Sequence, residues 1–93
     1  MTLLNLISYV KRGKNRKLVF LNLNKPLMPS ELVQKLFGSN SNTYFNLVSR
    51  ALSELKKYEL VEVLNPDEKT GRIYQRTKIG SKVYKKIQEE REH

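Results

Sequence analysis

The sequence predicts an α+β domain that is mainly helical, and three observations lead to this class. Apolar residues recur at helical spacing in the segments before residue 58. The pattern then changes to two short runs rich in β-branched residues, separated by a polar turn that contains Pro66 and Gly71. A further segment with apolar residues at helical spacing follows. The expected order is therefore helix, helix, helix, helix, strand, strand, helix.

Length and composition indicate one domain. The chain has 93 residues, of which 39% are hydrophobic and 29% charged, enough for one modest core. We expect a single domain over residues 1–93, formed by an N-terminal helix (1–12), a helix-turn-helix (29–58), a hairpin (60–77) and a C-terminal helix (78–93). The apolar runs are too short to span a bilayer, the N-terminus lacks signal-peptide features, and there is no cysteine. We therefore expect a cytoplasmic protein without a membrane segment.

Two helices are predicted before residue 26. The first has an apolar stripe that consists of Leu3, Leu6, Ile7 and Val10. A basic run over residues 11–17 follows, and Gly13 is a plausible break within it. The apolar stretch 18–21 could alone be a strand or a helix. We favour a helix because Leu18 and Leu21 can share a face, to which Val19 and Leu23 can also belong.

A short helix is predicted to begin at Pro29 and to end at Gly38. Proline suits the first helical position, Glu31 lies near the positive end of the helix dipole, and glycine suits a left-handed C-cap. Its inner face is expected to contain Leu32, Val33, Leu36 and Phe37. A polar turn over residues 39–42, rich in potential N-caps, precedes the clearest helix, Asn42–Lys57. The predicted inner face of that helix is Tyr44, Val48, Ala51, Leu52, Leu55 and Tyr58.

In the helix predicted over Asn42–Lys57, the face opposite the apolar one is polar and mostly uncharged. Asn, Ser and Thr can both donate and accept hydrogen bonds, and Arg can fork onto guanine, which suits the base edges in the major groove of DNA. We expect five residues on this face to contact bases, namely Asn42, Thr43, Asn46, Ser49 and Arg50. The alternative is a plain polar surface in which Asn42 and Thr43 cap the helix.

A β-hairpin is predicted from strand candidates at residues 60–64 and 72–77, with an exposed tip between them. Lys69 and Arg72 flank Gly71, and we expect them to reach phosphates or a narrow minor groove. Asp67 and Glu68 on the same loop would repel phosphates. The alternative is that the segment is merely a hairpin turn.

Thr77 is placed to cap the last helix, whose apolar stripe is Ile79, Val83, Tyr84 and Ile87. The charged tail, residues 89–93, is expected to fray. We expect a homodimer through the N- and C-terminal helices, because their stripes exceed what a minimal helix-turn-helix domain needs. The alternative is that these helices pack within the chain.

The residues from Val48 to Glu62 resemble the junction between recognition helix and wing in winged helix-turn-helix transcriptional regulators. Asn65-Pro66, Gly71–Tyr74 and Thr77–Gly80 resemble the archaeal members, related to the ArsR and MarR groups, and Pro29–Leu32 resembles their first helix-turn-helix element. The resemblance covers about residues 16–87. It implies a winged helix-turn-helix with extra terminal helices, in which the recognition helix reads bases and the hairpin, the wing, contacts the DNA backbone.

Two positions depart from this family's pattern. Met28 stands where these regulators carry a capping Ser or Thr, so we expect no side-chain cap from it. Arg76 stands where they carry an aliphatic residue before the Thr-x-x-Gly motif. Its side chain either snorkels or adds a basic contact.

A net charge of +9 in a chain of this size suggests an anionic partner. Nucleic acid is the usual one, an anionic membrane surface competes with it, and a Lys-rich solvated surface is the plain alternative. We expect three residues of the basic run to contact phosphates, namely Lys14, Arg16 and Lys17. The expected function is sequence-preferring binding of double-stranded DNA by a transcriptional regulator.

Two other functions remain open. One is a protein-interaction subunit of a transcription or replication assembly, because fold does not fix function. The other is RNA binding. Sequence-specific RNA recognition commonly stacks bases on exposed aromatic side chains, and the sequence offers few of these, which argues against RNA. Catalysis, cofactors and metals are not expected, since the only histidine is the terminal His93 and the acidic residues are scattered.

Overall fold

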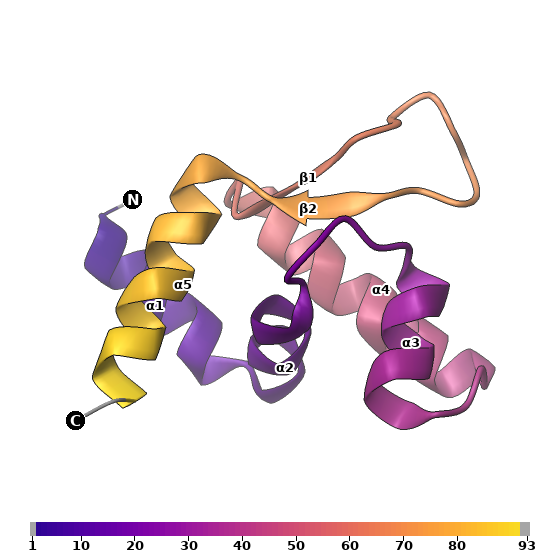
Figure 1. Ribbon diagram of the computed structural model, residues 1–93, viewed down its shortest axis with the longest axis horizontal. Coiled ribbons are helices and arrows are strands. Elements are labelled where there is room, and N and C mark those ends of the chain that lie inside the picture. Colours follow the sequence, from indigo (N-terminus) through magenta and orange to yellow (C-terminus); the bar gives the residue numbers. More distant parts are fainter. Residues whose placement is uncertain (1, 92–93) are drawn as a thin grey trace.

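The structure is a computed structural model, and it describes residues 2–91. Over these residues it is α+β and mainly helical, with the elements in the predicted order (Figure 1). The elements are α1 (Leu3–Arg12), α2 (Lys14–Asn22), α3 (Pro29–Phe37), α4 (Asn42–Lys57), β1 (Val61–Val63), β2 (Tyr74–Arg76) and α5 (Lys78–Arg91). This arrangement is compatible with a winged helix. None of these helices combines the length and the apolarity needed to cross a membrane.

The helices are arranged around α2, which lies between the terminal helices and the pair formed by α3 and α4. In Figure 1, α1 and α5 lie together at one end of the molecule and α3 lies at the other, while the hairpin extends past α4 towards α3. One apolar core joins all the elements and includes the predicted inner residues of α4, namely Val48, Ala51, Leu52 and Leu55. Burial of these side chains contributes about 1.5–3 kcal/mol for each large one.

Four predictions about which residues face the core are wrong in part, and the fourth, for Leu3, is described with the terminal helices below. The segment after Gly13 is a helix, as favoured, but its fully buried residues are Val19 and Phe20, while Leu18 and Leu21 are half-buried. This helix packs between other elements, so a single stripe does not describe it. Tyr44 and Ile79 are 36% and 42% exposed, because each lies in the first turn of its helix, beyond the edge of the core.

The helix ends show which caps the sequence uses. Gly38 ends α3 in the left-handed conformation, with φ of 65°, as predicted. Glu31 Oε1 accepts a hydrogen bond from the Met28 backbone N–H at 2.8 Å, so α3 keeps one half of a capping box without a Ser or Thr. Ser41 caps α4 by accepting from Tyr44 N–H at 3.3 Å. The capping role considered for Asn42 and Thr43 is therefore wrong.

The hairpin is antiparallel, with Val61 opposite Arg76 and Val63 opposite Tyr74, and its strands are shorter than predicted. A contact that the sequence did not predict fixes its position. Leu27 and Tyr74 exchange two backbone hydrogen bonds of 3.0 and 2.8 Å. The hairpin is thereby joined to the segment directly before α3.

Thr77 and Gly80 hold the start of α5 against the end of α4. Thr77 Oγ1 donates to the Glu59 carbonyl at 2.6 Å and accepts from Gly80 N–H at 3.0 Å, so Thr77 caps α5 as predicted. A Cβ at Gly80 would overlap the carbonyl oxygen of Leu60. The Thr-x-x-Gly spacing therefore has a structural reason, which is the close approach of the two backbones.

The apolar stripes of the terminal helices pack within the chain, which is the alternative that the sequence left open. Their buried residues are Leu6, Ile7, Val10, Val83 and Ile87. Leu3 is 38% exposed, so its predicted place in the apolar stripe is wrong. Leu4 is exposed as well, and the homodimer remains a prediction. The helix α5 continues through residues 89–91, where fraying was expected, and Glu90 forms an ion pair with Lys11 at 2.7 Å. Residues 92–93, including His93, lie outside the described residues.

Candidate nucleic-acid interface

The helix α4 presents a polar ridge on the surface of the domain. Four of the five residues expected to contact bases are exposed, namely Asn42, Thr43, Asn46 and Arg50, and Ser49 is half-buried. At about 100° per residue, Asn42 and Asn46 lie along the crest of this ridge. Thr43 and Arg50 turn towards α2, while Ser49 turns towards the hairpin, so the five residues do not share one contact surface.

A first groove runs between the ridge and the start of α2; we call it the α2-side groove. Its polar lining includes Lys14 and Asn15 from α2 and Thr43, Asn46 and Arg50 from α4. Gly13 separates α1 from α2 here, as the sequence suggested, and this break places Lys14 at the N-terminus of α2. The structure thus brings part of the basic run and the predicted base-contacting residues together, although they are far apart in the sequence.

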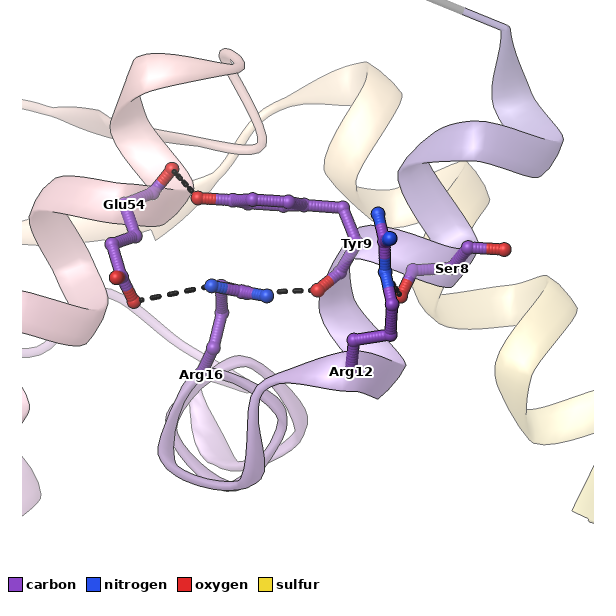
Figure 2. Close-up of polar contacts among 5 residues, drawn as sticks. All are labelled: Ser8, Tyr9, Arg12, Arg16 and Glu54. Atoms are coloured by element: carbon purple, nitrogen blue, oxygen red, sulfur yellow. Dashed lines mark hydrogen bonds and ion pairs between the residues drawn. The ribbon is translucent and has the colours of Figure 1, made fainter.

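Arg16 lines the same groove but its guanidinium is held by the domain (Figure 2). Its Nε donates to the Tyr9 carbonyl at 2.8 Å, its Nη1 lies 3.3 Å from Glu54 Oε1, and its side chain is only 14% exposed. The Tyr9 hydroxyl donates to the Glu54 backbone carbonyl at 3.3 Å, so each of the three residues Tyr9, Arg16 and Glu54 contacts the other two. Burial raises the pKa of Tyr9, and the nearby positive charge of Arg16 opposes this shift.

These contacts give Arg16 a different role from the one expected from the sequence. The sequence placed it with Lys14 and Lys17 as a phosphate contact, whereas its position makes it a structural residue that joins α1, α2 and α4. The structure also gives it an electrostatic effect on the groove. Its charge offsets that of Glu54, the one acidic residue among those lining this groove.

A second groove runs between the ridge and the hairpin; we call it the hairpin-side groove. It brings together Ser49 from α4 and Lys69 and Arg72 from the hairpin loop, all three expected from the sequence as contact residues. Phe45 and Ser30 also line this groove, and the sequence reasoning missed both. Phe45 could have been found, because it lies one helical turn before Ser49 on the same flank of α4.

Hydrogen bonds fix the shape of the hairpin loop. The Asn65 side chain accepts from Ile73 N–H at 2.7 Å and donates to the Gly71 carbonyl at 3.1 Å, and Gly71 has φ of 67°. Arg72 is half-buried and its Nε donates to the Glu68 carbonyl at 2.8 Å. Arg72 therefore supports the loop, while Lys69 is exposed on it.

Arg76 makes contacts within the domain, so it has neither of the two roles considered from the sequence, and it lines neither groove. Its Nε donates to the Phe20 carbonyl at 3.2 Å and its Nη2 to Asn24 Oδ1 at 2.8 Å. Its guanidinium carbon lies 3.6 Å from the centroid of the Tyr84 ring. Burial lowers the pKa of Arg76, and Tyr84 opposes this shift.

No protein-family model, curated protein or solved structure matches the chain. Within residues 2–91, no three His, Cys, Asp or Glu side chains gather as a metal site would require. The candidate interface is therefore defined by its own residues, which are the α4 ridge and the two grooves beside it.

Proposed function

We propose that this chain is a winged helix that binds double-stranded DNA with sequence preference, as a transcriptional regulator does. In this proposal α4 is the recognition helix and the hairpin is the wing. One observation carries the proposal. The hydrogen-bonding ridge of α4, which is mostly uncharged, is flanked by two grooves, and each groove has a lysine on its far wall, Lys14 in one and Lys69 in the other.

This arrangement matches the shape of the DNA major groove. The major groove admits one α-helix and displays base donors and acceptors on its floor, while a phosphate backbone borders it on each side. With α4 inserted, Asn42 and Asn46 face the base edges and Arg50 is able to fork onto a guanine. Lys14 and Lys69 then lie towards the two backbones. Phosphate contacts of this kind position a protein on DNA, and base contacts give it specificity.

The charge balance of the two grooves supports the same conclusion. The chain has a net charge of +9, which favours association with a polyanion and makes the affinity fall with salt. Arg16 offsets Glu54 in the α2-side groove, so the carboxylate there repels phosphate less. On the other side, Asp67 and Glu68 lie on the hairpin loop, but neither lines the hairpin-side groove.

A homodimer on a palindromic site belongs to the proposal as its oligomeric form. Two recognition helices one helical turn apart on DNA would gain affinity from two-fold symmetry. Because the terminal helices bury most of their stripes within the chain, only the remaining exposed apolar residues, such as Leu3 and Leu4, are free to join two copies. Sedimentation that shows only a monomer at micromolar concentration, free and on DNA, would remove this part of the proposal.

The second candidate is a winged-helix subunit that binds another protein of a transcription or replication assembly. An apolar surface on the other side of the hairpin favours it. Val61, Val63 and Ile79 line a shallow groove there, and Leu64 is exposed nearby. Charged side chains of both signs also line this groove, namely Lys56, Glu59, Glu62 and Lys78, so it accounts for the net charge of +9 less well than duplex binding does.

Selection of bound sequences from a random duplex pool separates these functions. The proposal predicts enrichment of a short motif and, for a dimer, of its inverted repeat. A pool that is retained at low salt without any enriched motif would limit the function to non-specific binding. Failure to retain duplex at low salt would favour the protein-interaction subunit, and preferential retention of structured RNA in a competition would favour RNA binding.

A further inference from the structure

An exposed phenylalanine stands out on the flank of the α4 ridge. Phe45 is 43% exposed, although α4 has distinct apolar and polar faces. Its chain neighbour Tyr44 is also exposed, but its ring has an aromatic partner. Tyr44 stacks on Phe37 with ring centroids 4.3 Å apart. Phe45 instead faces the hairpin-side groove.

From these positions we propose that Phe45 contacts the C5 methyl group of a thymine and so makes the binding site prefer a T·A pair at the edge nearest the hairpin. The inference rests on the proposed function, because it assumes that α4 enters the major groove. It assigns a preference for thymine to the side chain of Phe45. The polar residues of the ridge do not provide this apolar contact.

The chemistry of the base edges explains why an aromatic residue would serve here. Thymine is the only common base that presents a methyl group in the major groove, and apolar side chains such as Phe recognise it by contact. Ser49 lies one turn further along the same flank, where its hydroxyl can bond to thymine O4 or to the adenine amino group. An apolar contact and a hydrogen bond would thus fall on the same or adjacent base pairs.

The hairpin leaves room for a base edge beside Phe45. Gly71 lies across the groove in the left-handed conformation and has no side chain to fill the space. Lys69 stands on the same wall, where its ammonium group is available to a phosphate of the bound duplex. The groove therefore combines an apolar side chain, a hydroxyl and a cation, which complement the methyl group, the O4 acceptor and the phosphate of a thymidine nucleotide.

Replacement of thymine by uracil in the selected duplex tests this inference, since it removes only the methyl group. With the unaltered protein, uracil at one position near the hairpin end should weaken binding roughly fourfold, the loss expected for one methyl group returned to water. The Phe45→Ala variant should bind the thymine and uracil duplexes equally. The matched control is Leu64→Ala, another exposed apolar residue but outside this groove, which should keep the fourfold difference.

Three results would overturn the inference. The first is equal binding of thymine and uracil duplexes by the unaltered protein at every position, which needs no variant and leaves duplex binding intact. The second is an unchanged uracil effect in a folded Phe45→Ala variant, which would assign the methyl contact to another residue. The third is absence of any duplex binding, which would remove the proposed function together with the inference.

Discussion

Arg16 lies over the ring of Tyr9, with its guanidinium carbon 3.7 Å from the ring centroid, and also donates a hydrogen bond to the carbonyl oxygen of Tyr9. The same side chain reaches Glu54 on α4. A residue that belongs by sequence to a basic run is therefore part of the packing between three helices. This relationship separates the cations that hold the domain together from those that are available to a partner.

Replacing Arg16 by alanine is expected to destabilise the fold by about 1–3 kcal/mol, because it removes a stacked cation and a hydrogen bond to a half-buried carbonyl. Arg16→Lys should recover only part of this loss, since an ammonium group cannot reproduce the planar fork of the guanidinium. Urea unfolding measures the free energy of unfolding of both variants. A variant with unchanged stability but a salt slope of DNA binding reduced by about 1 would show that Arg16 contacts phosphate instead.

Lys14→Ala and Lys69→Ala should each weaken binding to all duplex sequences alike and reduce the slope of log K against log salt by about 1. The physical reason is that each lysine borders a groove beside α4 and would displace counterions from one backbone. Titrations of a labelled duplex at several salt concentrations measure this slope.

The matched control for both lysines is Lys85→Ala, an exposed lysine on α5 that lines neither groove. It should leave the salt slope nearly unchanged. If Lys85→Ala reduced the slope as much as the two groove variants, binding would depend on overall charge rather than on the proposed face.

Arg50→Ala should cost about 1–3 kcal/mol of binding free energy on the preferred duplex and relax the preference at one base pair, because a bidentate contact to guanine is lost. Equilibrium binding to the preferred duplex and to duplexes altered one base pair at a time provides the comparison. An equal loss on every sequence would assign Arg50 to the phosphate backbone.

Gly80→Ala should destabilise the fold by roughly 3 kcal/mol, because the added methyl group would overlap the carbonyl oxygen of Leu60 and force α5 away from β1. Gly38→Ala is the matched control, since it also adds one methyl group but meets open space and only strains a left-handed residue, at about 1–2 kcal/mol. Thermal unfolding of both variants tests this order. A smaller loss of stability in Gly80→Ala than in Gly38→Ala would contradict the close approach of Gly80 to the Leu60 carbonyl.

Local signals made much of this fold predictable. The bounds of α4, Asn42–Lys57, agree with the prediction because the amphipathic pattern there is long and a polar turn precedes it. Gly38 and Thr77 were also identified as caps, since capping depends on residues only a few positions apart. Such features follow from the sequence because the interacting groups are neighbours in the chain.

Features that join distant segments could not be predicted in this way. The bridge between Leu27 and Tyr74 and the enclosure of Arg16 depend on residues that only the folded chain brings together. The burial of Phe20 depends likewise on α2 lying between other helices. In the candidate site, the residue types on α4 were predictable, but their division between two grooves required the positions of α2 and the hairpin.

Binding of the whole protein to its selected duplex, compared with a shuffled duplex of the same composition over a range of salt concentrations, tests the central claim most directly. Sequence-preferring binding through α4 predicts tighter binding of the selected duplex at every salt concentration, with log K for both duplexes falling linearly with log salt. Equal affinity for the two duplexes, or no binding of either at low salt, would contradict it.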